Sequence, residues 1–434
     1  MKYKKYPSYK DSGVEWLGEI PTEWQNTRLG NIANITASGI DKKINEDEVK
    51  VKIINFTDIH KAKDFRLDNK KEYMVVTTQL DKKIKHQVVK GDLIFTPSSE
   101  TIEDIGISAL VDEDLDDTSF SYHVLRCNFT TNLNHKYKKY LTNNTLSLAQ
   151  FSCKARGTTR QTLGRDDFKT LYIPLPPIQE QQQIAKFLDN ATQKMDTLIK
   201  SQERLIELLK EKRQAVISHA VTRGLNPDVK FKDSGVEWLG DVPEHWGVKK
   251  LKYNLMLQNI KSNIANKNVI ALENIESWSG KYIKTDSTYS GEDVEFRAND
   301  ILFGKLRPYL AKVYKCNNNG IAFGDLLTYR PVKTIDSNFS FYYLISESFI
   351  NIVNSSTYGT KMPRASSDFI GDMEMTTPSF IEQQEIANYL DEKTKKIDTL
   401  IEKSKKSIKL LKEKRTALIS SAVTGKIDVR ELVS

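Results

Sequence analysis

Cysteine is scarce in this sequence. Only Cys127, Cys153 and Cys316 occur among 434 residues, and no two of them form a C-x-x-C pair. A disulfide framework requires an even set of cysteines, and a cysteine metal site requires paired ligands. The composition therefore excludes a disulfide-stapled secreted domain. It indicates a reducing compartment, in which we expect all three thiols to be reduced.

Long apolar runs are also missing. The best candidate, residues 341–353, is interrupted by serine, glutamate and asparagine, and a membrane-spanning helix requires about 20 mainly apolar residues. The basic first ten residues lead into Asp11 and Trp16 rather than into the apolar segment of a secretory signal. We therefore expect a soluble, cytoplasmic protein that makes no contact with a membrane.

Motifs for the common nucleic-acid enzymes are absent as well. The sequence has neither the Asn/Asp-Pro-Pro-Tyr/Phe motif and Gly-rich loop of an adenine methyltransferase nor the G-x-x-x-x-G-K-S/T loop of an ATP-driven motor. Its six histidines show no metal-ligand spacing. The acidic run at 112–117 is more typical of a solvated loop than of a nuclease site. We expect no catalytic residue, no metal and no cofactor on this chain.

Basic residues outnumber acidic ones. Lysine and arginine total 65 against 57 aspartates and glutamates, which gives a net charge of +8. This balance suits a polyanionic partner but does not by itself identify one. The length of 434 residues allows two or three domains, each with its own core.

Two segments of the chain are repeated. Residues 11–24 recur as residues 233–246 with 10 of 14 positions identical. Residues 181–224 align without gaps on residues 383–426 with 25 of 44 positions identical, including the string Leu-Leu-Lys-Glu-Lys-Arg. Self-similarity of this kind dictates architecture before any local feature does. The chain is therefore a tandem duplication with pseudo-twofold character.

Each copy of the second repeat predicts a long helix. Residues 184–221 contain no proline or glycine, and apolar residues recur at intervals of three and four. The second copy ends at Gly425, a typical C-terminal stop. The apolar strip is narrow, which favours antiparallel pairing of the two helices as in a coiled coil. The predicted pairing residues are Leu188, Met195, Leu198, Leu205, Leu209, Val216, Leu390, Ile397, Leu400, Ile401, Ile408, Leu411 and Leu418.

Two readings of these helices remain open. At about 1.5 Å per residue, a helix over residues 184–221 reaches roughly 57 Å, enough to separate two DNA-contacting domains by more than the roughly 34 Å of one DNA turn. The same pattern is typical of a coiled coil with no DNA role. The lysines and arginines on the helices are more often a solvated face than a phosphate site.

The segments between the repeats differ from one another. They mix short β-rich runs, such as residues 49–56, 73–78 and 301–303, with Gly, Asn and Asp turns. We expect a compact α+β domain with a β-rich core in each. The predicted segments are 1–24 (shared), 25–180 (first variable domain), 181–224 (helix), 225–246 (shared), 247–380 (second variable domain), 381–426 (helix) and 427–434 (tail).

Each variable domain has two candidate contact loops, which offer cationic and hydroxyl groups and, in the second domain, aromatic groups as well. Arginine can pair with guanine, glutamine with adenine, and threonine with base or phosphate. Taken alone, each loop is equally typical of a polar surface turn. The candidate contacts are Ser98, Ser99, Lys154, Arg156, Gly157, Thr158, Thr159, Arg160 and Gln161 in the first domain, and Lys305, Arg307, Tyr309, Tyr358, Gly359, Thr360, Lys361 and Arg364 in the second.

Four tryptophans occupy matched places in the two copies: Trp16 and Trp24, and Trp238 and Trp246. An indole ring can stack on a base. Identical placement in both copies fits a shared packing role better, since the framework is the part that repeats. We therefore predict that these tryptophans pack.

Together these residues resemble the specificity subunit of type I restriction-modification enzymes. The resemblance covers nearly the whole chain. It rests on Ser-Gly-Val-Glu-Trp-Leu-Gly at 12–18 and 234–240, Gly-Thr at 157 and 359, Ile-Pro-Leu-Pro-Pro at 173–177, the helix entry at 182–189 and the Lys-Glu-Lys-Arg endings. One departure is Met-Thr-Thr-Pro-Ser at 375–379, where the first copy is proline-rich.

The resemblance implies two target-recognition domains that each read one half of a split, asymmetric site in double-stranded DNA. It implies that the helices fix the gap and dock two methyltransferase subunits. S-adenosylmethionine, ATP and Mg²⁺ would then belong to the methyltransferase and restriction subunits. The competing hypothesis is a helical scaffold that assembles other proteins without reading DNA.

Overall fold

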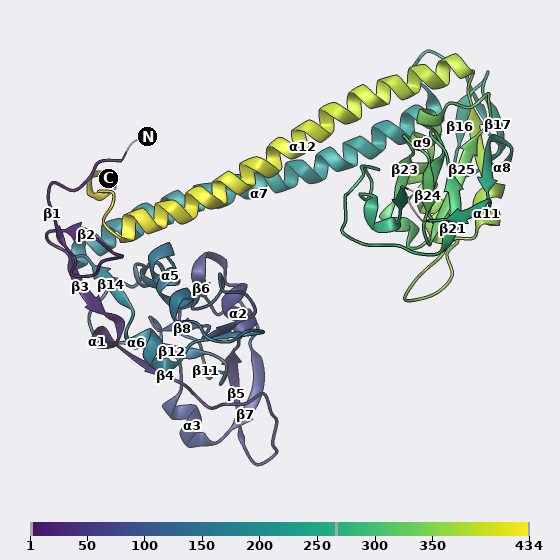
Figure 1. The fold of residues 1–434 in the computed structure, drawn as a ribbon. Coiled ribbons are helices and arrows are strands. Elements are labelled where there is room, and N and C mark those ends of the chain that lie inside the picture. The colour runs from purple at the N-terminus through teal and green to yellow at the C-terminus, as the bar shows by residue number, and fades with distance from the viewer. Residues whose placement is uncertain (1–2, 265–267, 433–434) are drawn as a thin grey trace. The chain divides into compact units, whose positions relative to one another are not determined.

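The computed structural model describes residues 3–264 and 268–432. The chain divides into two units, Met1–Ser201 with Ser407–Ser434, and Gln202–Lys406. Each unit combines a mixed α+β domain with one part of each of two long helices, α7 (Ile178–Arg223) and α12 (Phe380–Val423) (Figure 1). The predicted α+β class and the two long helices are confirmed. Within the described ranges, no helix is long and apolar enough to cross a bilayer.

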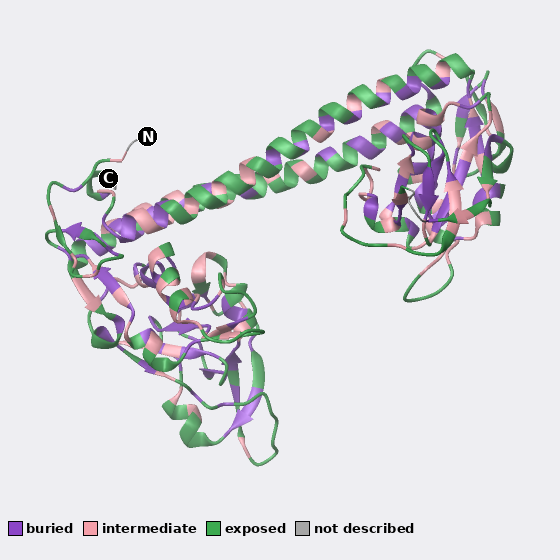
Figure 2. Ribbon diagram, in the orientation of Figure 1, coloured by how far each residue is buried: buried purple, intermediate pink, exposed green. Residues whose placement is uncertain are grey.

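An apolar seam joins α7 and α12 within each unit. In the first unit, Leu188 and Met195 lie in one core with Leu418. In the second, Leu209 packs with Ile401. Lower residue numbers on α7 face higher numbers on α12, so the helices run antiparallel, as predicted. Figure 2 shows buried and exposed residues alternating along both helices, the pattern of a narrow seam.

The seam differs from the prediction at three leucines. Leu198, Leu205 and Leu400 are 51%, 41% and 48% exposed, whereas Ile199 is buried and Ile206 packs against the seam. One residue turns a helix by about 100°, so two neighbouring residues cannot both face a narrow seam. The other predicted residues are buried (Leu188, Met195, Leu209, Leu390, Ile397, Ile401 and Leu418) or half-buried (Val216, Ile408 and Leu411).

The arginine that ends the repeated Leu-Leu-Lys-Glu-Lys-Arg string joins helix to helix. In the first unit, Arg415 Nε lies 3.4 Å from Asp196 Oδ1. In the second, Arg213 Nε lies 3.2 Å from Asp398 Oδ1. These are matched pairs, because each residue is displaced by 202 positions from its counterpart.

The same arginines also contact a loop of the α+β domain in their unit. The Arg415 guanidinium lies 5.3 Å from the centroid of the Phe65 ring and 3.4 Å from Asp64. Arg213 donates a hydrogen bond of 2.8 Å to the backbone carbonyl of Trp278. The repeated arginine therefore fixes each domain against its helices.

A tyrosine forms a second matched link. The Tyr140 hydroxyl donates to Asp189 of α7 at 2.7 Å, and the Tyr342 hydroxyl donates to Asp391 of α12 at 2.6 Å. All four residues are placed identically in the two copies. Each variable domain thus holds its own following helix through the same hydrogen bond.

The first domain is built on a five-stranded sheet in the order β4-β12-β8-β10-β6 and a three-stranded sheet in the order β11-β5-β7. Its strands are β1 (Tyr9–Asp11), β2 (Glu19–Pro21), β3 (Gln25–Arg28), β4 (Ala33–Thr36), β5 (Val49–Ile54), β6 (Arg66–Leu67), β7 (Met74–Thr78), β8 (Leu93–Phe95), β9 (Ser98–Ser99), β10 (Ser108–Val111), β11 (Thr118–Phe120), β12 (Leu125–Phe129), β13 (Gln161–Thr162) and β14 (Tyr172–Leu175). Its helices are α1 (Leu29–Ile32), α2 (Phe56–His60), α3 (Leu80–Lys85), α4 (Lys138–Thr142), α5 (Thr145–Lys154) and α6 (Arg165–Lys169).

The second domain has two four-stranded sheets, in the orders β18-β25-β22-β23 and β19-β21-β24-β20. Its strands are β15 (Phe231–Asp233), β16 (Asp241–Pro243), β17 (Gly247–Lys250), β18 (Leu255–Gln258), β19 (Lys261–Asn263), β20 (Val269–Ile270), β21 (Glu292–Phe296), β22 (Ile301–Gly304), β23 (Val313–Lys315), β24 (Gly320–Ala322), β25 (Leu326–Pro331) and β26 (Glu374–Thr377). Its helices are α8 (Leu251–Asn254), α9 (Ser337–Ile345), α10 (Glu347–Ser355) and α11 (Ser367–Asp372).

The central strands β8 and β22 begin with the same turn. Gly91 and Asn299 adopt left-handed backbone conformations with φ of 95° and 71°, which glycine and asparagine tolerate best. The following aspartate carboxylates are buried and accept backbone N–H groups, Asp92 from Val89 and Asp300 from Arg297. The dipeptides Gly91-Asp92 and Asn299-Asp300 therefore form the same turn, which starts the central strand of each domain.

The tryptophans follow the packing prediction in all but one case. Trp24 and Trp246 are buried, and the Trp238 ring makes edge contacts with Tyr343 and Phe349. Trp16 is 44% exposed, so for this residue the prediction is wrong, because the turn between β1 and β2 leaves its ring on the surface. The repeated N-terminal segment thus contributes one fully buried indole ring to each unit.

Candidate nucleic-acid interface

The two predicted loops of the first domain lie side by side. Residues 96–99 and 154–162, here called the first loop cluster, are joined by pairing of β9 with β13. The Leu163 N–H donates to the Pro97 carbonyl at 2.8 Å. Arg160 Nε lies 3.3 Å from Ser98 Oγ. Segments that are far apart in sequence therefore form one surface.

The second domain repeats this arrangement. Residues 304–309 and 358–364, here called the second loop cluster, are joined by backbone hydrogen bonds. The Arg307 N–H donates to the Pro363 carbonyl at 2.7 Å, and the Ala365 N–H donates to the Lys305 carbonyl at 2.9 Å. The structure thus brings together both pairs of loops that the sequence singled out.

The repeated Gly-Thr dipeptide lies at the tip of each cluster, and the turn itself explains the glycine. Gly157 and Gly359 have φ of 117° and 94°. A β-carbon at Gly157 would lie 2.2 Å from the Arg160 carbonyl oxygen, far inside van der Waals contact. A side chain is therefore excluded at position 157 and strained at position 359.

Several candidate side chains point to solvent. Tyr309 and Tyr358 are 46% and 65% exposed, and the side chain of Arg156 is 76% exposed. Each cluster thus offers cations, and the second also offers aromatic rings. The exposed candidates are Arg156, Gly157, Thr158, Thr159, Arg160, Arg307, Tyr309, Tyr358, Gly359, Thr360 and Lys361.

Three candidate side chains in the first cluster make hydrogen bonds within the protein. Lys154 Nζ donates to Thr170 Oγ1 at 2.6 Å, and the Gln161 amide donates to the Gly157 carbonyl at 2.7 Å. Ser99 is buried, and its hydroxyl accepts from the backbone N–H of residue 101. These side chains stabilise the loops rather than face solvent.

Arg364 is also held within the protein. Its guanidinium makes two hydrogen bonds to Asp325, of 3.1 and 3.0 Å, and Lys305 Nζ lies 3.8 Å from the same carboxylate. The hydrogen bonds to Asp325 raise the pKa of Arg364. A paired, two-point contact of this kind fixes the orientation of the arginine.

The first domain has a histidine where the second has Asp325. Strand β12 pairs Leu125 with Phe95 of β8, and β25 pairs Leu327 with Phe303 of β22. Phe95 and Phe303 hold matched places in these strands, so their partners Leu125 and Leu327 are equivalent. His123 and Asp325, two positions before those leucines, are therefore equivalent too.

His123 and the adjacent Tyr122 were not identified from the sequence as candidate contacts. His123 is exposed, and its ring lies 3.7 Å from that of Tyr122. Burial, together with Lys42 and Arg160, lowers the pKa of His123. His123, with its lowered pKa, therefore lies beside the first loop cluster, at the position that the carboxylate of Asp325 occupies beside the second.

The acidic run at 112–117 is partly paired with basic groups. Asp112 lies 2.8 Å from His135 Nε2 and 3.4 Å from Arg66. Across the described ranges, no three His, Cys, Asp or Glu residues are grouped as metal ligands.

Comparison with known proteins decides the family. Residues 21–208 and 239–410 each match the type I restriction modification DNA specificity domain. The chain belongs to this family. The specificity subunit therefore carries two DNA specificity domains, and the internal repeat found in the sequence corresponds to them. A match to DNA specificity domains disfavours the alternative of a scaffold that does not read DNA.

Named relatives agree. The chain is 25% identical over 449 residues to a protein named as the MjaX type I restriction enzyme specificity subunit of Methanocaldococcus jannaschii, with 99% of both chains covered. It is 27% identical over 297 residues to the MjaVIII specificity subunit of that organism, covering 64% of this chain and 67% of the relative. Similarity therefore extends over the full length.

Solved structures share the fold. The HsdS subunit from Thermoanaerobacter tengcongensis matches with a TM-score of 0.54 and 15% identity, covering 94% of this chain and 98% of that one. A chain from a structure describing complex assembly and conformational transition of the type I R-M system matches with a TM-score of 0.68, also at 15% identity, covering 93% and 98%. At this identity the likeness concerns the fold alone.

The two arginines discussed above should behave differently when truncated. We expect Arg156→Ala to weaken binding to the cognate duplex by about 1–3 kcal/mol while leaving the fold intact. The Arg156 side chain is 76% exposed and is held by a single contact of 3.4 Å with Asp167, so it can turn toward DNA. Arg364→Ala should instead raise hydrogen exchange of the second loop cluster, because it removes both hydrogen bonds to Asp325 and leaves only the 3.8 Å contact with Lys305. Filter binding and hydrogen-exchange mass spectrometry separate the two effects. Equal exchange changes in both variants would contradict this assignment.

Proposed function

We propose that each specificity domain reads one half of a split, asymmetric sequence in double-stranded DNA, with its loop cluster making the contacts. One observation carries the proposal. The hydrogen bonds that build the two clusters are alike, whereas the side chains placed at equivalent positions differ. The pair Thr162 and His123 in the first domain corresponds to Arg364 and Asp325 in the second. A common frame with unlike chemistry suits two different half-sites.

The exposed groups fit DNA recognition. Arg156, Arg160 and Arg307 carry donors suited to guanine edges or phosphates, and the threonine hydroxyls at 158 and 360 can serve either. Main-chain N–H groups beside a glycine can approach a phosphate closely. We assign base reading to the arginines and positioning to the threonines.

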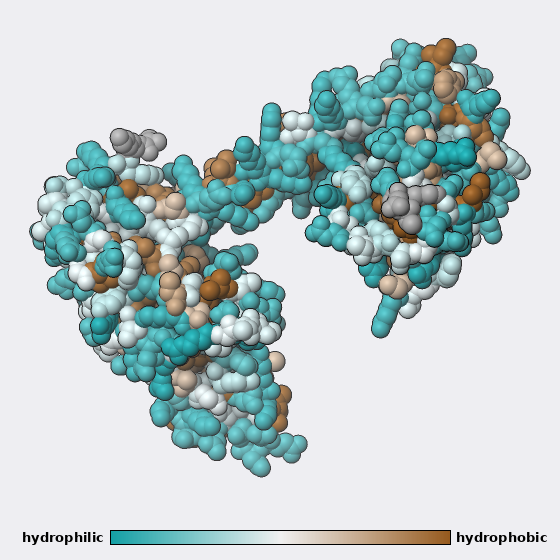
Figure 3. Space-filling view, in the orientation of Figure 1, coloured by the Kyte–Doolittle hydropathy of each residue, from teal (hydrophilic) through white to brown (hydrophobic). Residues whose placement is uncertain are grey.

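We further propose that the two long helices set the distance between the half-sites and dock two methyltransferase subunits. Helix α7 has 46 residues, about 69 Å at 1.5 Å per residue, which exceeds the roughly 34 Å of one DNA turn. Leu198 and Leu400 occupy equivalent positions and are about half exposed. Figure 3 shows hydrophobic groups among hydrophilic ones along the helices. Exposed leucines repeated in both copies suit two identical partners.

In this proposal the chain directs chemistry that it does not perform. Methyltransferase subunits would bind S-adenosylmethionine, and restriction subunits would use ATP and Mg²⁺. The substrate is cellular DNA, so we place the assembly in the cytoplasm. Purified alone, the chain should neither methylate nor cut DNA.

Selection from a random duplex library tests the reading function. With the methyltransferase subunits present, we expect enrichment of one bipartite sequence, with an affinity that falls as salt rises. The matched control is the complex lacking this chain, which should enrich nothing. Enrichment of no sequence, or of one uninterrupted sequence, would contradict the proposal.

A further inference from the structure

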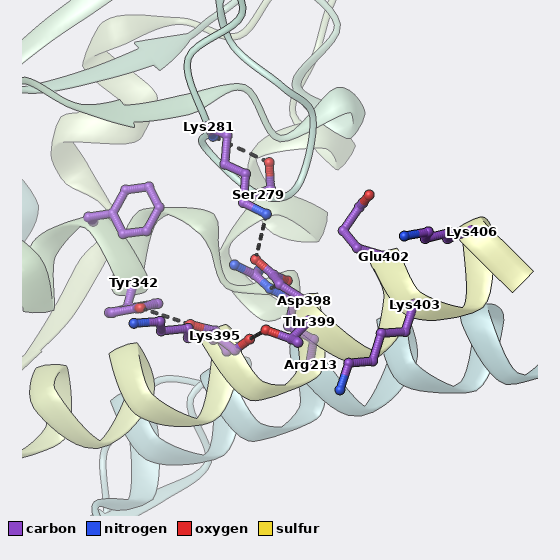
Figure 4. A pocket seen from close by; sticks show the side chains of 12 residues that line it. Arg213, Ser279, Lys281, Tyr342, Lys395, Asp398, Thr399, Glu402, Lys403 and Lys406 are labelled. Atoms are coloured by element: carbon purple, nitrogen blue, oxygen red, sulfur yellow. Dashed lines mark hydrogen bonds and ion pairs between the residues drawn. The ribbon is translucent and has the colours of Figure 1, made fainter.

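A basic cavity lies within the second unit, apart from the second loop cluster. It has a volume of about 680 Å³ and lies between the loop 276–281 and one face of α12 (Figure 4). Its lining includes Lys281, Lys395, Thr399, Lys403 and Lys406, with Ser279 at its edge. The position suggests a ligand held jointly by domain and helix.

Three lysines and a threonine of α12 form a row. Lys395, Thr399, Lys403 and Lys406 follow one another at intervals of four, four and three residues, which places them on one helix face. At about 1.5 Å per residue the row is roughly 16 Å long. One strand of DNA carries a charge about every 3.4 Å along its axis, so the row spans several phosphates.

The acidic residues of the cavity are already neutralised. Asp398 lies 3.2 Å from Arg213 and 2.9 Å from Lys281. Glu402 lies 2.8 Å from Lys405, beside the cavity.

Three lysines remain without a counter-ion. Within the described part of the chain, Lys395, Lys403 and Lys406 have no carboxylate within ion-pair distance, and all three are exposed. The cavity therefore keeps an excess of positive charge, which suits an anionic ligand.

The first copy shows that this charge is not needed for helix pairing. Positions 395 and 403 correspond to Gln193 and Ser201, both uncharged. The arginine–aspartate pair between the helices is nevertheless the same in both copies. Lys395 and Lys403 are thus an addition to the second copy only, whereas Lys406 corresponds to the cationic Arg204. The paired helices do not require the two added lysines.

We propose that this cavity binds the phosphate backbone of DNA next to the half-site read by the second domain. The inference rests on the proposed function, since it concerns the same duplex. Lysines that line an open cavity make ionic contacts without reading bases, and the hydroxyls of Ser279 and Thr399 add donors. The contact strengthens binding on one side of the asymmetric site and leaves the recognised sequence unchanged.

The test replaces two lysines by the residues of the first copy, Lys395→Gln and Lys403→Ser, in the complex with the methyltransferase subunits. Each lost phosphate contact should reduce the slope of log affinity against log salt by about 0.9. The loss of affinity between 50 and 200 mM salt should therefore shrink by about three- to fourfold per contact. The selected bipartite sequence should remain the same. Gln193→Lys with Ser201→Lys should steepen the slope.

Lys396→Gln is the matched control, since Lys396 is the next residue on the same helix but lies outside the cavity and pairs with Glu392. It should leave the slope at the wild-type value. A slope in the double variant equal to that of wild type overturns the inference. So does failure of the double variant to assemble on a gel-filtration column, which would make the lysines a protein contact. A wild-type complex that selects no sequence refutes the proposed function instead.

Discussion

Lys139→Met should lower the free energy of unfolding of the first unit by about 3–5 kcal/mol. The Lys139 side chain is 1% exposed, and its ammonium group pairs with Asp64 and, at 2.8 Å, with Asp189. Removing the cation leaves Asp64 with only the longer contacts to Arg66 and Arg415, of 3.3 and 3.4 Å. Asp189 keeps the Tyr140 hydroxyl and Lys136, the latter at 3.9 Å. Truncating one partner of a buried ion pair is costly because the remaining charge loses its compensation.

Native-state hydrogen exchange measures this loss, with the amides of the second unit as an internal reference. Position 139 corresponds to Phe341 in the second copy, so Phe341→Met is the matched control. It removes no charge and should cost under about 1.5 kcal/mol. Adding Asp64→Asn to Lys139→Met should restore part of the stability. A loss below 1 kcal/mol for Lys139→Met would show that the carboxylates find other partners.

Exchanging residues 25–180 for the equivalent domain of a relative should change one half of the recognised sequence and leave the other half intact. Each mismatched base pair costs about 1–3 kcal/mol. Losing a half-site of several base pairs should therefore bring affinity for the original sequence to the non-specific level, about 10³-fold weaker or more. Sequencing of N6-methyladenine in cells that express the hybrid complex provides the measurement.

The reciprocal exchange of residues 247–380 is the control for the hybrid. It should change the half-site that the first exchange left intact. If either hybrid alters both halves, the two domains do not read independently, and the partition of the chain into two readers is wrong.

The architecture was readable from sequence because the duplication repeats residues that build it. The long helices, their antiparallel pairing and the β-rich domains were all predicted. The residues of the apolar seam were harder to predict, because Leu198 and Ile199 fit the helical period of apolar residues equally well. Only the packed partner helix selects the isoleucine and leaves the leucine exposed.

The candidate site was predictable in part. The loops were identified from cations, hydroxyls and glycine, and the structure places the members of each pair together. The roles of their side chains were not readable, since Arg364 and Arg156 look alike in sequence but differ in that Asp325 holds only the first in a two-point contact. His123 and Asp325 lie 202 positions apart, like the repeated helices, but their equivalence was not noticed because the two residues are chemically unlike.

The tyrosine that links each domain to its following helix bears on how a domain could be exchanged between related genes. Tyr140 and Tyr342 make the same hydrogen bond to matched aspartates. The contact that attaches a domain to its helix is therefore the same in both halves of the chain. A crossover between related genes within the repeated helix would deliver a foreign domain that already fits. A new DNA specificity would then need a single recombination event, without gradual adjustment of the protein that receives the domain.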